Sequence, residues 1–136
     1  MSAAPILETR GLTCRFGGVT AVDNVDLTIA EGKIDQFQAI AEEMVAGTQT
    51  EPGALGYEFY LDEDRRQCRL IEIYSDSDAA LTHCKGPVVQ QLVPKLLSVS
   101  LLAGFSVYGD LSVETAEVLT QGGAQLFTTW RGFNRF

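Results

Sequence analysis

Residues 54–74 read ALGYEFYLDEDRRQCRLIEIY, and this stretch decides the fold. Apolar and polar side chains alternate along residues 55–60 and again along residues 69–74, which is the period-two pattern of half-buried strands. The acidic run 62–64 between them is typical of a hairpin tip. Two strands this close in the chain should pair antiparallel, and the return strand should then present one set of side chains to each face: Leu70, Glu72 and Tyr74 on one, and Arg69, Ile71 and Ile73 on the other.

A strand and a helix are expected before this hairpin. Val25, Leu27 and Ile29 alternate with polar residues, which predicts a strand. Residues 33–46 then carry apolar side chains at helical spacing, with Gly47 as the expected end of the helix.

Two helices and a strand are expected after the hairpin. Ser75 and Asp78 fit a capping box that opens a short helix. Pro87 suits the first position of the next helix, which Pro94 should kink or end early. Alternation in residues 101–107, with Leu101, Ala103, Phe105 and Val107 in phase, predicts a further strand.

The order strand, helix, strand, strand, helix, strand predicts an α+β fold, the ferredoxin-like split βαβ arrangement with a four-stranded antiparallel sheet. Helices should cover one face, and a second copy of the chain most simply covers the other, giving a symmetric homodimer. We expect the face that carries Tyr57, Glu72 and Tyr74 to be hidden by this twin subunit and to enclose a hollow.

Three segments are expected along the chain: an N-terminal extension over residues 1–22, the ferredoxin-like domain over 23–110, and a C-terminal helix and aromatic tail over 111–136. Ser112 can cap the C-terminal helix, and residues 125–130 are extended in pattern. The aromatic tail should be docked, either on a partner subunit or over the mouth of a cavity.

The charge, apolar stretches and cysteines of the sequence limit the classes of partner and the cellular compartment that can be expected. The net charge of −8 disfavours nucleic acid and anionic membrane surfaces as partners. No signal peptide is apparent, and the apolar stretch 96–108 is too short to span a bilayer, so the sequence predicts a cytoplasmic protein. The three cysteines are scattered without a C-x-x-C pair, which predicts reduced thiols at Cys14, Cys68 and Cys84.

Residues 6–34, ILETRGLTCRFGGVTAVDNVDLTIAEGKI, resemble the opening of an ABC-transporter ATP-binding subunit, in which an aromatic residue at the position of Phe16 stacks on adenine. That family continues into a glycine-rich loop with Gly-Lys-Ser/Thr, but residues 35–39 here have a helical pattern. The motif G-x-x-x-x-G-K-[ST] occurs nowhere in the chain. The sequence therefore lacks the loop whose backbone N–H groups and lysine would bind the phosphates, and the chain is not expected to be an ATPase. The extension is either a fusion remnant or a strand-forming segment whose likeness is accidental.

Residues 25–108 resemble the antibiotic biosynthesis monooxygenase domain. The resemblance is carried by the order and spacing of several short features: Glu31-Gly32-Lys33, Phe37, Met44, Glu51-Pro52-Gly53, Gly56-Tyr57-Glu58, residues 70–74 and Ala80-Leu81-Thr82-His83. It implies a homodimeric α+β barrel with a cavity between sheet and helices. Some members oxidise quinols or polycyclic aromatics with O2 and no metal or flavin, so no cofactor is expected.

The best-known members of that family place Asn and Trp side chains in the pocket. This sequence has neither between Asp35 and Thr129, so only Trp130 and Asn134 in the tail could substitute for them. The leading hypothesis is a cofactor-independent monooxygenase acting on a small aromatic or quinol. The alternative is a non-catalytic dimeric ligand-binding or interaction domain of the same fold.

Glu72 and His83 are the candidate catalytic residues. On an apolar strand face Glu72 should have a raised pKa, which suits a general base, although it could instead be a structural carboxylate bonded to backbone or to His83. His83, the only histidine, could accept a proton from a phenol, or could be a helix-end residue satisfied by a neighbour. The family's second histidine corresponds to Val88, so no metal site is expected.

Aromatic residues are the candidate pocket lining. Tyr57, Phe59 and Tyr74 suit a flat aromatic ligand, although they could equally be ordinary sheet core. Trp130 and Arg131 are the candidates in the tail.

Overall fold

The computed structural model describes residues 21–133 and 135 of the 136-residue chain. Five strands form one sheet in the order β2-β3-β1-β4-β5. They are β1 (Ala21–Ile29), β2 (Ala54–Leu61), β3 (Gln67–Tyr74), β4 (Ser100–Gly109) and β5 (Gln125–Phe127). The first four pair antiparallel, as predicted, whereas β5 pairs parallel to β4 and adds a short fifth strand from the segment expected to be extended.

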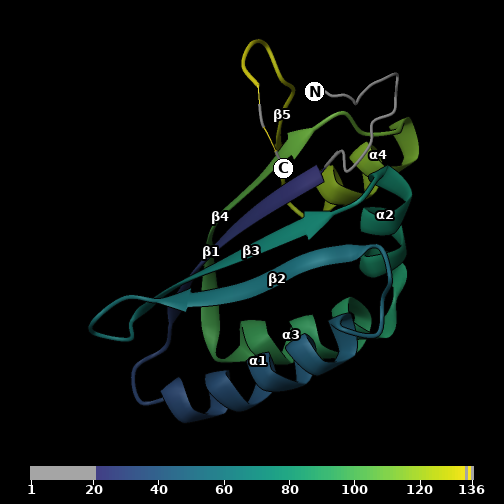
Figure 1. Cartoon of the computed structure of the whole chain (residues 1–136). Coiled ribbons are helices and arrows are strands. Elements are labelled where there is room, and N and C mark those ends of the chain that lie inside the picture. The colour runs from purple at the N-terminus through teal and green to yellow at the C-terminus, as the bar shows by residue number, and fades with distance from the viewer. Residues whose placement is uncertain (1–20, 134, 136) are drawn as a thin grey trace.

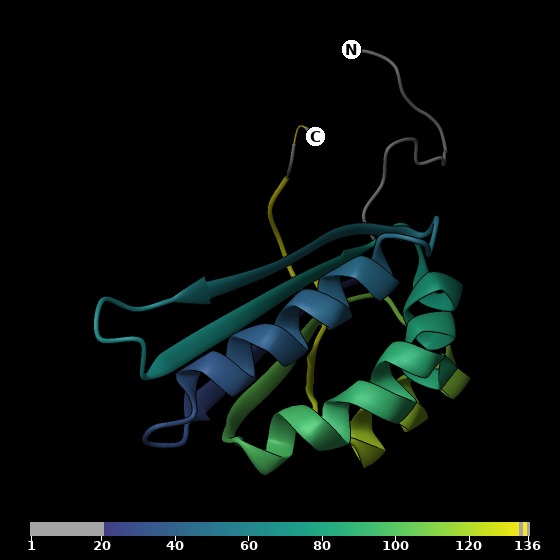
Figure 2. The ribbon, with the colours of Figure 1, turned by 90° about the horizontal axis from the view of Figure 1, so that it is seen from below.

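The helices pack on one side of this sheet (Figures 1 and 2). They are α1 (Ile34–Thr48), α2 (Ser77–Lys85), the π-helix η1 (Val88–Leu92), α3 (Val93–Ser98) and α4 (Val113–Gln121). Through β4 the chain therefore follows the predicted split βαβ order. Ser112 caps α4 as predicted, because its Oγ accepts a hydrogen bond of 3.2 Å from the backbone N–H of Thr115.

Gly47 does not end α1, because the helix continues to Thr48. A Cβ atom at Gly47 would lie 2.6 Å from Cγ2 of Val88, so glycine allows close packing of α1 on η1 instead of stopping the helix.

The capping box predicted for α2 is also displaced. Asp76 caps the helix by accepting a 2.7 Å hydrogen bond from the backbone N–H of Ala79. The capping side chain and the backbone N–H that donates to it are three residues apart, as expected, but the cap is Asp76 and not Ser75.

Pro94 interrupts its helix, as predicted. The wide π turn of η1 comes immediately before α3, in which Pro94 lies at the N-terminus. Proline has no N–H to donate into the preceding turn, so the helical hydrogen-bond ladder must break at this point.

Alternation along β1 and β3 is confirmed: Leu27 and Leu70 are buried, whereas Arg69 is exposed. However, the face that carries Tyr57, Glu72 and Tyr74 is covered by the chain's own helices, so the prediction that a twin subunit hides it is wrong. A period of two determines which residues share a face, but it does not determine which face the helices cover.

The opposite surface, here called the open face, carries cross-strand neighbours from four strands. Register places Val22 between Ile73 and Tyr108, and Tyr108 next to Phe127. The rings of Tyr108 and Phe127 stack with centroids 5.3 Å apart. This face therefore presents aromatic and aliphatic side chains that no helix of the described chain covers.

An irregularity between Asp26 and Leu27 shifts the register of β1 against β4. Leu27 consequently lies opposite Leu102, whereas Leu101 lies opposite Thr28 and is 72% exposed. The predicted alternation of β4 therefore holds for Phe105 and Val107 but not for Leu101.

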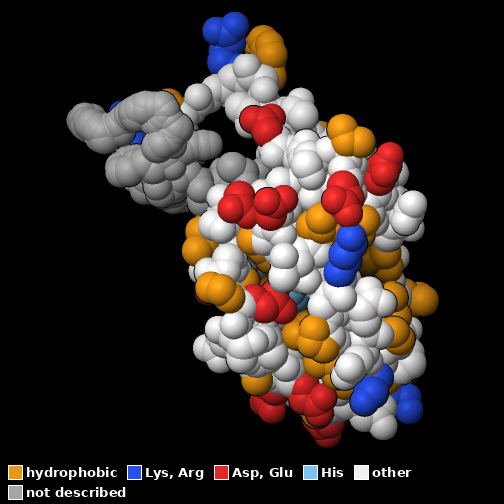
Figure 3. Space-filling model, turned by 90° about the vertical axis from the view of Figure 1, so that its right-hand side faces the viewer, with side chains coloured by type: hydrophobic (Ala, Val, Ile, Leu, Met, Phe, Trp, Pro, Cys, Tyr) orange, Lys and Arg blue, Asp and Glu red, His pale blue; other side chains and the backbone are white. Residues whose placement is uncertain are grey.

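The surface around α2 and α4 mixes acidic and apolar side chains with few basic ones (Figure 3). Among the described residues, no helix has the length and apolar character needed to cross a membrane. Cys68 and Cys84 are unpaired thiols, and burial raises their pKa to about 11 and about 12, respectively. Cys14, Phe16 and the rest of residues 1–20 lie outside the described part, as does Asn134.

Candidate active site

A cavity of about 310 Å³ lies between the helix-covered face of the sheet and the helices. Its walls are mostly aliphatic, and its few polar groups come from β1, β2, β3, α2 and η1: Asp23, Tyr57, Glu72, His83 and Gln90. A mainly apolar space with a few polar groups is the usual character of a small-molecule site.

Glu72 lies in the middle of β3 and is only 6% exposed. Tyr74, two residues along on the same face, donates its phenolic hydrogen to Oε1 of Glu72. Burial raises the pKa of Glu72, while His83 and the Tyr74 hydrogen bond oppose that rise. The raised pKa expected from the sequence thus has the expected cause, desolvation by an apolar environment.

His83 connects two carboxylates. Its ring is 3% exposed, its Nδ1 lies 2.9 Å from Oε1 of Glu51, and its Nε2 lies 3.7 Å from Oε1 of Glu72. A carboxylate beside Nδ1 favours a proton on that nitrogen, which leaves Nε2, on the Glu72 side of the ring, able to accept a hydrogen bond. The partner Glu51 comes from the turn before β2, a residue that the sequence marked only as part of a turn.

Asp23 is the residue that sequence reasoning missed. It is 3% exposed, lines the cavity and lies directly opposite Glu72 in the β1–β3 pairing. Burial, and secondarily the charge of Glu72, raise its pKa to about 8. The signal was present in the sequence: Asp23 is in phase with Val25, Leu27 and Ile29, so it is an acid on the apolar face of a strand.

Two of the predicted aromatic residues belong to this site. Tyr57 lines the cavity, with its ring centroid 5.4 Å from that of His83. Tyr74 lies behind Glu72, with its ring 5.6 Å from His83. Burial raises the pKa of both phenols, so both are neutral hydrogen-bond donors.

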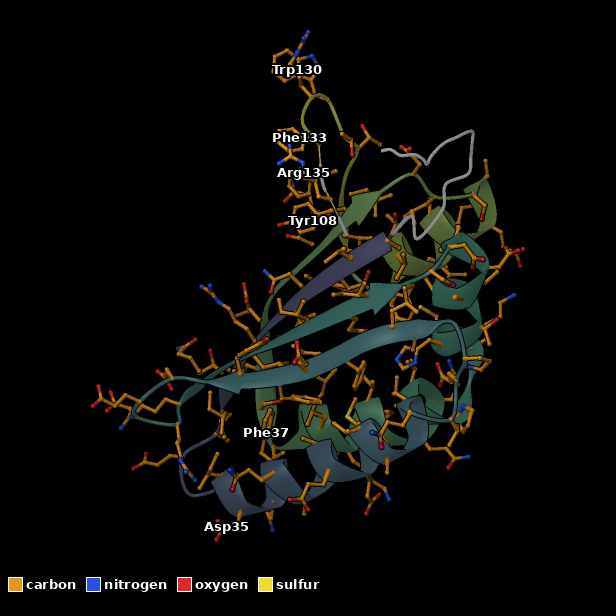
Figure 4. The ribbon with its side chains drawn as sticks, viewed as in Figure 1. Asp35, Phe37, Tyr108, Trp130, Phe133 and Arg135 are labelled. Carbon is orange, nitrogen blue, oxygen red and sulfur yellow. The ribbon has the colours of Figure 1, made fainter. Side chains whose placement is uncertain are left out.

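Two other predicted residues do not line the cavity. Phe59 packs edge-on between Tyr57 and Phe37, with centroid separations of 5.7 Å and 6.3 Å. Trp130 is 86% exposed and stands with Phe133 and Arg135 on the side of the sheet away from the helices (Figure 4). Arg131 lies over the Trp130 ring, 5.0 Å from its centroid, and no described residue of the tail lines the cavity.

Comparisons with known proteins agree with this architecture. The solved structure of MupZ from Pseudomonas fluorescens matches with a TM-score of 0.73 and 23% identity, covering 87% of this chain and 96% of that one. A proposed antibiotic biosynthesis monooxygenase from Nitrosomonas europaea matches with a TM-score of 0.61 and 18% identity, over 73% of this chain and 97% of its own. A Bacteroides thetaiotaomicron protein of unknown function, described as a possible oxidoreductase, matches with a TM-score of 0.62 and 16% identity, over 68% and 98%.

At these identities the solved structures show a shared fold. A search of curated proteins found no match. The family model for antibiotic biosynthesis monooxygenase matches residues 22–95, more than half of the chain, and includes β1 to η1 with Asp23, Glu72 and His83. The chain therefore belongs to the antibiotic biosynthesis monooxygenase family.

Proposed function

We propose that this chain is a monooxygenase that acts without a cofactor on a small aromatic or quinol substrate, with O2 as the oxidant. The observation that supports this most directly is the chain of groups Glu72, His83 and Glu51 at the wall of a mainly apolar cavity. Family membership supports a monooxygenase type of chemistry in general, and the cavity supports a small apolar ligand.

The proposed reaction begins when a phenolic hydroxyl of the substrate is deprotonated. His83 Nε2 or Glu72 takes the proton, and the second carboxylate, Glu51, stabilises the imidazolium through Nδ1. The electron-rich anion then reduces O2 itself: the substrate supplies all four electrons and two hydrogens, gains one oxygen atom as a new carbonyl, and the second oxygen atom leaves with those hydrogens as water. In this reaction the aliphatic walls keep water from the anion, and neutral Tyr57, which lines the cavity, donates a hydrogen bond to it.

A non-catalytic ligand-binding domain is the second candidate, and one observation favours it. The side chains that line the cavity include no Asn or Trp. The lining amide, Gln90, donates one of its two Nε2 hydrogens to the carbonyl of Cys84 at 2.9 Å. The Asn and Trp side chains of the best-known members therefore have no counterpart among the described residues that line this cavity.

Oxygen uptake with a panel of quinols and hydroxylated aromatics tests the proposal. We expect turnover in the wild type and a loss of about 100-fold or more in Glu72→Gln and in His83→Gln, because each removes the proton acceptor. Glu58→Gln is the matched control, since Glu58 is exposed on β2, points away from the cavity face and accepts a hydrogen bond from the Tyr60 hydroxyl at 2.9 Å. Absence of uptake, together with a raised melting temperature in the same compounds, would favour the binding domain.

We also propose that a second copy of the chain covers the open face. The cross-strand row of Ile73, Val22 and Tyr108 and the stacked pair of Tyr108 and Phe127 make this face apolar. Dimers are common in the family. The exposed aromatic residues of the tail lie on the same side of the sheet as this face (Figure 4). Burial of these groups between two copies would supply the driving force for association.

A further inference from the structure

We infer that Asp23 and Glu72 form an acid–base pair that enolises a small apolar ketone in the cavity. Glu72 removes a proton from the carbon beside the carbonyl, and Asp23 gives its own proton to the carbonyl oxygen. The inference rests on the proposed function in so far as the same cavity must admit the substrate, but the step itself needs no oxygen.

The first support is the placement of the two carboxyl groups. Asp23 and Glu72 are directly paired residues on neighbouring antiparallel strands, so their side chains leave the same face of the sheet. Directly opposite residues have Cβ atoms about 5 Å apart, which places both carboxyl groups within reach of one small ligand. Both groups line the cavity, and both are more than nine-tenths buried.

The second support is an unsatisfied atom. Among the described residues, Asp23 Oδ1 is buried and has no hydrogen-bond partner. Buried polar atoms are nearly always bonded, so such an atom at a cavity wall indicates a ligand that completes its bonding. A ketone oxygen is a suitable ligand atom, because it accepts a hydrogen bond and carries no charge that would repel Glu72.

The third support is that the two carboxyl groups have different surroundings. Two adjacent buried carboxylates repel each other, so one of them should keep its proton at neutral pH. Glu72 is the better anion because the Tyr74 hydroxyl donates to it and His83 Nε2 lies 3.7 Å away. Among the described residues none donates a hydrogen bond to Asp23 Oδ1, and the Asp23 pKa of about 8 reflects burial and the charge of Glu72.

Among the described residues that line the cavity or interact with Asp23, His83 is the only potential cation. The remaining titratable groups that line the cavity or interact with Asp23 are His83 and Cys84 from α2, Tyr57 from β2 and Tyr74 from β3. Glu51 lies behind His83 and is acidic. Apart from His83, which faces Glu72, none of these side chains is basic.

The step is balanced without an oxidant or reductant. The C–H electron pair becomes the π bond of the enol, and the carbonyl π pair forms the new O–H bond. The proton from carbon goes to Glu72, and the proton of Asp23 goes to oxygen. Reversal restores both groups, and the enol is the electron-rich form that an oxygen-dependent step would use.

Anaerobic hydrogen–deuterium exchange tests this inference, with 2-tetralone as the probe. The protein is incubated with the ketone in D2O, and the loss of the proton signals beside the carbonyl is followed by NMR. We expect exchange faster than in buffer, and a reduction of at least about tenfold in both Asp23→Asn and Glu72→Gln. The control is Asp26→Asn, the next acid along β1, which points to the open face and pairs with Arg69 at 3.2 Å. That variant should exchange like the wild type.

Exchange no faster than in buffer, or equal exchange in wild type and Asp23→Asn, would overturn the acid–base pair. Carboxyl carbon NMR gives a second readout that needs no ligand. The Asp23 carboxyl should titrate near pH 8 and move to lower pH in Glu72→Gln, whereas titration below pH 5 in the wild type would overturn the assignment. Exchange that depends on both carboxyl groups, without oxygen uptake, would reject the monooxygenase alone, and oxygen uptake without such exchange would reject the pair alone.

Discussion

The Nδ1 atom of His83 lies 2.9 Å from Oε1 of Glu51 and ties the turn before β2 to the helix that follows β3. His83 is 3% exposed, and the Glu51 side chain is 18% exposed, so the hydrogen bond is largely shielded from water. This one contact both fixes the orientation of the imidazole and connects α2 to the edge of the sheet.

Removal of the Glu51 carboxylate should destabilise the fold. Glu51→Ala leaves a buried Nδ1–H without an acceptor, which we expect to lower the free energy of unfolding by about 1–3 kcal/mol in urea denaturation. Glu51→Gln should lower the free energy of unfolding by less, because the glutamine amide oxygen can still accept a hydrogen bond from His83 Nδ1. Glu58→Ala is the control, since it removes an exposed hydrogen bond to Tyr60 and should change stability little. Equal stabilities of Glu51→Ala and Glu58→Ala would contradict the role of this contact.

Asp23 should make the protein less stable as the pH rises. The folded chain keeps the Asp23 proton up to about pH 8, whereas an unfolded chain releases it near about pH 4. Between these values the unfolded state binds fewer protons, so the free energy of unfolding decreases with pH, by at most about 1.4 kcal/mol per pH unit. Asp23→Asn removes this cost, and its stability relative to the wild type should grow from pH 5 to pH 7.5. Urea unfolding at the two pH values measures this, and a difference independent of pH would refute it.

Substitution of Gly47 should disturb the contact between α1 and η1. Alanine is the better helix former by about 1 kcal/mol, but its Cβ would lie 2.6 Å from Cγ2 of Val88. We expect Gly47→Ala to destabilise the protein by about 1–3 kcal/mol, because overpacking outweighs the helix propensity. Val88→Ala in the Gly47→Ala background should recover part of that loss. A stabilised Gly47→Ala would show that the two helices separate easily.

The open face should control association. Wild-type protein is expected to run as a dimer in size-exclusion chromatography with light scattering, and Ile73→Lys is expected to run as a monomer, because a lysine in the apolar row opposes burial. Val113→Lys is the control: Val113 is 78% exposed on α4, on the helix side of the sheet. A monomeric wild type, or dissociation by Val113→Lys alone, would reject the open face as the interface.

Some site residues were predictable because local pattern carries the information. Alternation placed Leu70, Glu72 and Tyr74 on one face, and the structure confirms it. Glu72 could be singled out because it is an acidic residue on the strand face that is otherwise apolar, and His83 could be singled out because it is the only histidine in the sequence. The same reasoning would have found Asp23 if the alternation of β1 had been followed back past Asn24, since the strand begins at Ala21.

The amino-acid sequence by itself determined the order of the elements and the residues that share each strand face, because periodicity and turn chemistry are local properties. Only the tertiary structure decided which face the helices cover, that Asp23 lies opposite Glu72, and that Glu51 reaches His83. These relationships join residues that lie 49 and 32 positions apart in the chain. They depend on strand register and helix packing, which arise when the whole core is buried at once.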